Sequence, residues 1–137
     1  MKELKAQDIM DKYDLIYKNY QEEKAEKGIY INFLDGYFRV EKLPKDELAK
    51  YIQEIIKDQI KGAEKFMFAC LPELQNKELM NKFKVKNGNE RELIEKIFVG
   101  HDDVKGQVFS ELLKFNDINL FETDSVIIEK VSDLEKK

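Results

Sequence analysis

The sequence predicts a mainly α fold: a compact multi-helix domain with one small β-hairpin at about residues 29–42 and a long central helix at about residues 45–71. Apolar residues recur at positions i, i+3 and i+4 through most of the chain, which is the period of an amphipathic helix. Glycine and proline fall mainly between these periodic segments, where turns are expected. With 137 residues and an apolar fraction of 42%, the chain has the size and composition of one folded domain.

Residues 1–27 are predicted to form an N-terminal helical extension, semi-detached from the rest of the domain. Gly28 follows this segment and is suited to end a helix. The apolar residues that recur at helical spacing in it are Ile9, Met10, Tyr13, Ile16, Tyr17 and Tyr20.

The next segment, residues 29–42, alternates β-branched and aromatic residues on both sides of Asp35-Gly36. This pattern predicts two antiparallel strands joined by a tight turn. An isolated two-stranded hairpin is only marginally stable, so we expect it to pack on the helices or to pair with another chain.

The central helix is predicted to begin at Pro44, because proline suits a first helical turn and Asp46 and Glu47 follow it. Its apolar stripe keeps the same phase through Gly62, where a bend is expected, and Pro72 ends it.

Shorter helices should follow, and the last of them would bury Ile127, Val131 and Leu134. The residues expected to cap these helices are Asn76, Asn89 with Glu92 in a capping box, Asp102 or Asp103, and Thr123 or Asp124.

Charge and composition argue against several classes of function. The net charge is −4 and the only arginines are Arg39 and Arg91, so the basic stripe of a nucleic-acid-binding protein is missing. Cys70 is the single cysteine, which excludes an internal disulfide and favours the reducing cytoplasm. The longest apolar run, Phe66 to Leu71, is too short to span a bilayer, and the first ten residues do not have the pattern of a signal peptide.

Candidate catalytic residues are few. His101-Asp102-Asp103 could form an acid–base pair or one corner of a metal site, but a tight site needs further His or Cys ligands. We expect a solvated loop there, with the aspartates capping the next helix. Cys70 lies in an apolar run that would raise its pKa, so a buried structural role is favoured over a nucleophile. The sequence therefore predicts a protein that is not an enzyme and that has no metal or cofactor.

The candidate partner-binding residues are aromatic. The tyrosines of the first helix could either face the core or lie at a protein interface, where tyrosine is enriched, and both interpretations stay open. The hairpin contributes two more aromatic candidates. The predicted partner-binding set is Tyr13, Tyr17, Tyr20, Phe33 and Tyr37.

An ordered series of short signatures runs from Phe66 to Lys130. Cys-Leu-Pro-Glu-Leu (70–74) follows an apolar helix end, and Lys-Glu-Leu (77–79) with Phe83 follows in a short helix. The remaining signatures are Glu92-Leu93, Lys96-Ile97-Phe98, Gly100, Val104, Val108, Glu111-Leu112, Phe115-Asn116 and Ile118 to Leu120. In this order the region of residues 66–130 resembles the XkdN-like tail assembly chaperones of long-tailed phages and phage-derived bacteriocin particles. Phe83-Lys84 departs from the Tyr-Gly pair expected there.

The resemblance implies a small helical chaperone of the bacterial cytoplasm, encoded by a prophage or a bacteriocin cluster and absent from the finished particle. Its implied partner is the tape measure protein, with the tail tube protein and further copies of the chain as additional candidate partners. A small helical adaptor that binds one folded partner is the alternative function.

Overall fold

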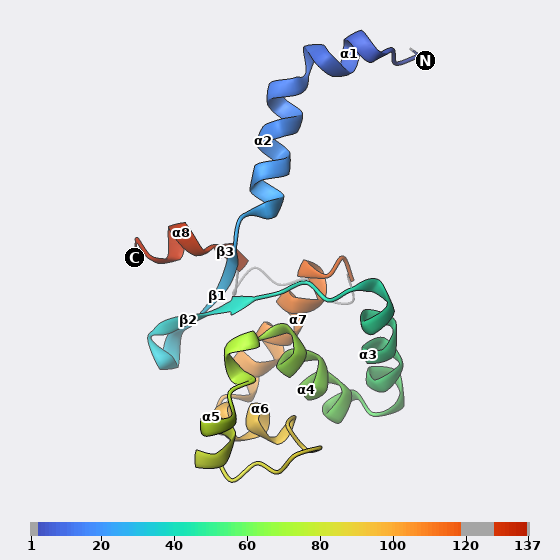
Figure 1. The fold of residues 1–137 in the computed structure, drawn as a ribbon. Coiled ribbons are helices and arrows are strands. Elements are labelled where there is room, and N and C mark those ends of the chain that lie inside the picture. The colour runs from blue at the N-terminus through green and yellow to red at the C-terminus, as the bar shows by residue number, and fades with distance from the viewer. Residues whose placement is uncertain (1–2, 119–127, 137) are drawn as a thin grey trace.

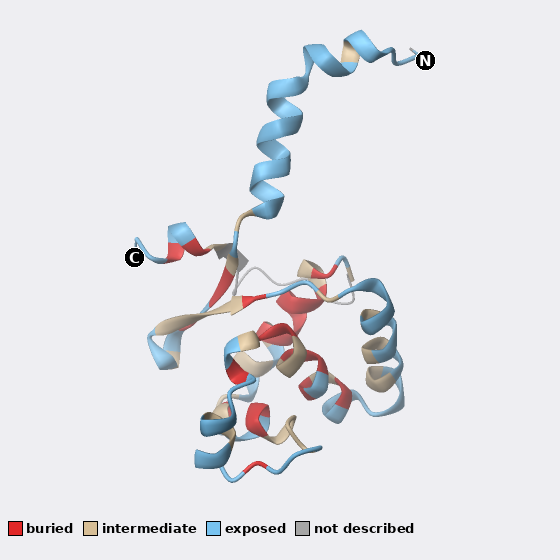
Figure 2. Ribbon diagram, viewed as in Figure 1, coloured by how far each residue is buried: buried red, intermediate tan, exposed pale blue. Residues whose placement is uncertain are grey.

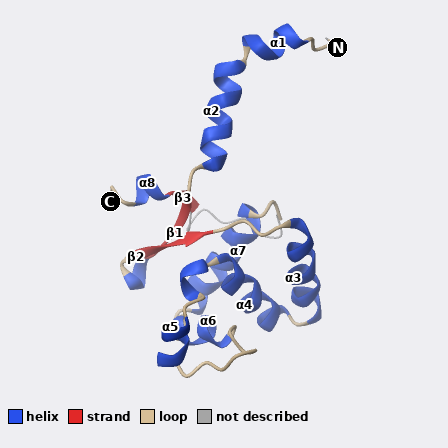
Figure 3. Cartoon of the chain, in the orientation of Figure 1, coloured by secondary structure: helices blue, strands red, loops and turns tan. Residues whose placement is uncertain are grey.

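The structure, a computed structural model, describes residues 3–118 and 128–136, with the side chains of residues 128 and 129 excepted. The protein is mainly α, as predicted, with one small antiparallel sheet (Figures 1 and 3). The elements are α1 (Ala6–Asp11), α2 (Tyr13–Lys24), β1 (Lys27–Ile31), η1 (Asn32–Leu34), β2 (Gly36–Val40), α3 (Lys45–Lys57), α4 (Gln59–Cys70), η2 (Pro72–Leu74), α5 (Lys77–Lys82), α6 (Glu92–Ile97), α7 (Asp102–Phe115), β3 (Ile128–Lys130) and α8 (Val131–Leu134).

The core is centred on α4, which packs against α3, α6 and α7 (Figure 1). Burial is concentrated on these central elements and on β1, whereas α3 and α5 are covered on one side only (Figure 2). The fully buried apolar side chains of the core include Ile29, Phe66, Met67, Cys70, Leu93, Ile94, Val108 and Leu112.

The prediction of one long helix over residues 45–71 is wrong. The helix ends at Lys57, Asp58 takes an extended conformation, and α4 begins at Gln59. The Asp58 carboxylate accepts a hydrogen bond from the backbone N–H of Lys61 and so caps α4. The chain therefore folds back on itself, and α3 packs along α4, where Gly62 lets the two backbones come close.

The predicted hairpin is present, with its strands at residues 27–31 and 36–40 instead of within 29–42. The connection is longer than a tight Asp35-Gly36 turn, because a 3₁₀ turn at residues 32–34 precedes Asp35, which adopts φ 49°. A third strand, β3, pairs antiparallel with β1, so the sheet order is β2-β1-β3.

The C-terminal segment differs from the predicted final helix. Residues 128–130 form a strand, and only Val131–Leu134 are helical. Val131 and Leu134 are buried, as predicted, whereas Thr123, Asp124 and Ile127 lie outside the described residues. Gly28 lies in β1 and does not end a helix; the side chain of Leu134 lies close to it, so that a Cβ on Gly28 would be 2.8 Å from Leu134 Cδ1.

Some of the capping residues predicted between residues 76 and 103 cap their helices, and others do not. Asn76 caps α5 by accepting a hydrogen bond from the backbone N–H of Leu79. The Asn89 side chain bonds the Glu92 side chain and not the helix backbone, so the predicted capping box does not form. His101 occupies the cap position of α7, and Asp102 and Asp103 lie in its first turn, where carboxylates complement the helix dipole.

The N-terminal extension consists of two helices with a break at Lys12, and the second ends at Lys24, three residues before β1. Together they project away from the rest of the molecule (Figure 1). Among the described residues, no helix has the length and apolar content that a membrane span requires.

Candidate functional site

The projecting helices α1 and α2 carry an exposed apolar surface. All residues of both helices are exposed or half-buried, so no other part of the described chain covers them (Figure 2). Six apolar side chains that recur along the two helices are each 46–61% exposed. We call this set the N-terminal apolar stripe: Ile9, Met10, Tyr13, Ile16, Tyr17 and Tyr20.

The stripe is apolar at its centre and polar at its edge. The rings of Tyr13 and Tyr17 stack with their centroids 5.7 Å apart, and Lys24 Nζ lies 5.5 Å from the centroid of the Tyr20 ring. Leu15 is also exposed, but at 100° per residue it points to the opposite side of α2. An apolar stripe about 100° wide on a surface helix ordinarily faces a packed core, but none of the described residues covers this one.

Ion pairs fix the base of α2 to the body. Lys130 of β3 donates to Glu22 at 2.8 Å, and Lys42, beyond β2, donates to Glu23 at 2.5 Å. These hydrogen bonds and the lysine charges lower the pKa of Glu22 and of Glu23. A third pair joins Arg39 to Glu26 just below the helix. Cations from three different segments thus hold the base of α2, while the stripe stays exposed.

The five predicted partner-binding residues do not form one surface. Tyr13, Tyr17 and Tyr20 lie together in the stripe, so their placement in a core is excluded for the described chain. Phe33 is half-buried and stacks on His101, with ring centroids 3.8 Å apart. The Tyr37 hydroxyl donates a hydrogen bond to Glu135 at 3.0 Å. The hairpin residues therefore make contacts within the chain, on elements other than the stripe.

The candidate catalytic residues have structural contacts. The backbone N–H of His101 donates to the Phe98 carbonyl at 2.9 Å, and the His101 ring is stacked on Phe33. Among the described residues, no three His, Cys, Asp or Glu side chains are grouped as metal ligands would be. Cys70 is fully buried, and burial raises its pKa to about 12. Its thiolate is therefore disfavoured at neutral pH.

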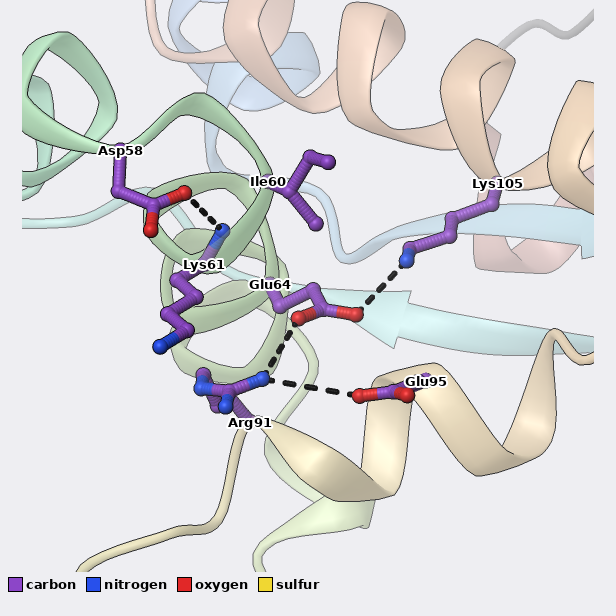
Figure 4. Close-up of a pocket in the computed structure, with 7 residues that line it drawn as sticks. All are labelled: Asp58, Ile60, Lys61, Glu64, Arg91, Glu95 and Lys105. Carbon is purple, nitrogen blue, oxygen red and sulfur yellow. Dashed lines mark hydrogen bonds and ion pairs between the residues drawn. The ribbon is translucent and has the colours of Figure 1, made fainter.

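A charged cluster is a second candidate site, and sequence analysis missed it. Glu64 of α4 is 1% exposed, and its two oxygens accept hydrogen bonds from Arg91 at 2.9 Å and from Lys105 at 2.7 Å (Figure 4). Glu95 lies 3.7 Å from Arg91 on the side facing solvent. A cavity of about 380 Å³ adjoins the cluster, with Lys61 on its wall.

The geometry of this cluster favours a structural role. Both oxygens of Glu64 are used by the two cations, which come from the N-terminal end of α6 and from α7. The cluster thus links three elements of the core, and a buried carboxylate with two cations is the arrangement that compensates its loss of hydration. Glu64 follows Ile60 by four residues and precedes Met67 by three, so the sequence places it on an apolar helix face. A charged residue at such a position was the signal for a buried carboxylate.

An apolar groove lies next to the cluster, between α4 and α7. Its volume is about 360 Å³, and its apolar lining includes Ile60, Ala63, Met67 and Phe109. Ile56, at the end of α3, and Ile60 are 79% and 70% exposed. The groove with the exposed Ile60 side chain forms a second apolar surface, on the body of the molecule.

Comparison with protein-family models, with curated proteins and with solved structures finds no match to this chain.

Proposed function

We propose that this chain is a non-enzymatic tail assembly chaperone of the bacterial cytoplasm, which binds the tape measure protein while a phage or phage-like tail is built. The tail tube protein is the second candidate client. As the sequence resemblance implies, the chain would leave before the particle is complete. The observation that carries the proposal is the N-terminal apolar stripe on helices that project from the body.

A chaperone for a long helical client needs an apolar surface that the client can cover and release. The stripe offers roughly 600 Å² of exposed surface, from six side chains of about 200 Å² each that are about half exposed. This area is at the lower end of specific protein interfaces, where binding is transient. The charged base of α2 supports the same role, because it presents the stripe at a distance from the body.

The direct test is co-expression with the tape measure protein encoded in the same gene cluster, followed by size-exclusion chromatography with light scattering. We expect a soluble complex with several copies of this chain per client. The double variant Tyr13→Ala, Tyr17→Ala should lose the complex. A matched double variant on the hairpin, Tyr30→Ala with Leu34→Ala, should retain it, because those exposed side chains are outside the stripe. A client that remains insoluble with the unmodified chain would contradict the proposal.

An adaptor that binds one folded partner is the second candidate function, and the apolar groove between α4 and α7 favours it. Stoichiometry separates the two. An adaptor binds its partner one to one through the body, so Ile60→Asp would abolish its complex while Tyr13→Ala with Tyr17→Ala would not. The chaperone gives the opposite pattern and several chains per client.

A further inference from the structure

The N-terminal apolar stripe has features that suit a second copy of the same chain. This surface is the same one that is proposed above to bind the client, but the pairing of two copies does not require a client. We propose that two copies of this chain form a reversible dimer in which their α2 helices pack antiparallel, stripe against stripe.

The first argument is area. A standard interface buries about 800 Å² on each partner, and weak, transient interfaces bury less. The roughly 600 Å² offered by the stripe is the most that an identical stripe could cover, which gives a small interface without contributions from the body. Such an interface is large enough for a dimer that forms and dissociates, and too small for a permanent one.

The second argument is shape. On α2, the exposed residues Tyr13, Ile16, Tyr17 and Tyr20 are separated by three, one and three residues, which puts them on one helix face. This spacing is the same in both directions, so an antiparallel copy can place Ile16 opposite Tyr17 twice at the centre of the pair. Each Tyr20 then lies opposite Tyr13 of the other copy, at the end of α2 next to the break at Lys12. The smaller Ile16 side chains thus meet tyrosine rings at the centre of the pair.

The third argument is charge. The sequence at the tip end of the projection, residues 2–14, carries four acidic residues and three lysines: Glu3, Asp8, Asp11 and Asp14, with Lys2, Lys5 and Lys12. At the base, Glu22, Glu23 and Glu26 are each paired with a cation of the body. Lys18, Lys24 and Lys27 leave an excess of positive charge there. An antiparallel pair brings each acidic tip near a basic base, whereas a parallel pair would bring the two acidic tips together.

The position of the body agrees with this direction. Each α2 joins its body at the C-terminal end, so an antiparallel pair puts the two bodies at opposite ends of the helix pair (Figure 1). The helices can then approach to the 8–10 Å typical of packed helices without contact between the bodies.

Sedimentation of the isolated full chain over a range of concentrations tests the pairing. The mass should rise from one chain toward two with concentration. Ile16→Asp places a charge in the stripe and should leave only the monomer. Leu15→Asp introduces the same charge one residue away, on the opposite side of α2, and should dimerise as the unmodified chain does. A chain that stays monomeric at all concentrations, or equal behaviour of the two variants, would overturn the proposal.

Spin labels test the direction of the helices. Cys70 is buried and unreactive, so Leu15→Cys and Lys24→Cys variants can be labelled selectively. At 1.5 Å per residue, the antiparallel pair separates the two Lys24→Cys labels by about 22 Å along the axis and the two Leu15→Cys labels by only about 5 Å. Similar distances for both label pairs would indicate parallel helices and overturn the arrangement. Because no client is present, failure here leaves the chaperone proposal standing, and failure to bind the client leaves the dimer standing.

Discussion

Gly62 of α4 lies against the backbone of Glu54 in α3, so closely that a Cβ on Gly62 would be 2.5 Å from the Glu54 carbonyl oxygen. This contact occurs where the two helices turn back on each other. Because the atoms it would strike belong to the backbone, an alanine can be accommodated only if one helix moves.

We therefore expect Gly62→Ala to lower the free energy of unfolding by about 1–3 kcal/mol, because overpacking outweighs the better helix propensity of alanine. Gly106→Ala in α7 is the matched control. A Cβ there would have no atom of the described residues within 4 Å, so alanine should stabilise the protein by about 0.5–1 kcal/mol. Urea denaturation of both variants measures the difference. Equal effects of the two substitutions would contradict the close packing of α3 on α4.

The charged cluster around Glu64 predicts a loss of stability when one cation is removed. Arg91→Met leaves one oxygen of a buried carboxylate without its cation, and we expect a loss of about 1–3 kcal/mol in the free energy of unfolding. Lys61→Met is the control, because Lys61 lines the same cavity and forms no ion pair with another described side chain. It should change the stability by less than about 0.5 kcal/mol. If Lys61→Met lowered the free energy of unfolding as much as Arg91→Met does, the stability would depend on the cavity wall and not on the ion pair.

The base of α2 predicts a specific pH response. The pKa of Glu22 and of Glu23 is below the ordinary value of 4.5, because each accepts a hydrogen bond from a lysine. A lowered pKa in the folded state means that the pairs stabilise the base above pH 4.5 and that this contribution is lost as the pH falls through the folded values. Carboxyl titration by NMR should show both shifts. Lys130→Met should restore the pKa of Glu22 alone, and Lys42→Met that of Glu23 alone, whereas a joint change would contradict two separate pairs.

Sequence patterns predicted the helical faces well because the signal for a helix face is local. The apolar spacing of Tyr13, Tyr17 and Tyr20 identified the stripe, but it left open whether the stripe is buried. Burial depends on whether another element packs there, and the structure shows that none of the described ones does. The break at Asp58 was missed since the apolar period runs through it, although Asp58 is itself a good cap.

Features that depend on distant pairing were not predicted. Strand β3 pairs Lys130 with Lys27 across most of the chain, and so short a strand has little pattern of its own. The partners of Glu64 come from residues 91 and 105, a relationship that spacing along one helix cannot show. The amphipathic helix faces were thus within reach of the sequence, whereas helix boundaries such as Asp58 and the contacts that assemble the elements were not.

Cys70 provides the last prediction. Burial raises its pKa from 9.0 to about 12, so the folded state keeps the proton that the unfolded state loses above pH 9. A raised folded pKa means that this contribution to stability is intact below pH 9 and falls by about 1.4 kcal/mol for each unit of pH between 9 and 12. Denaturation at pH 8 and pH 10 should show a larger loss for the unmodified chain than for Cys70→Ala, which lacks the thiol. A thiol reagent at pH 8 should react with Cys70 only as fast as the protein opens, and rapid reaction of the native chain would contradict the buried position.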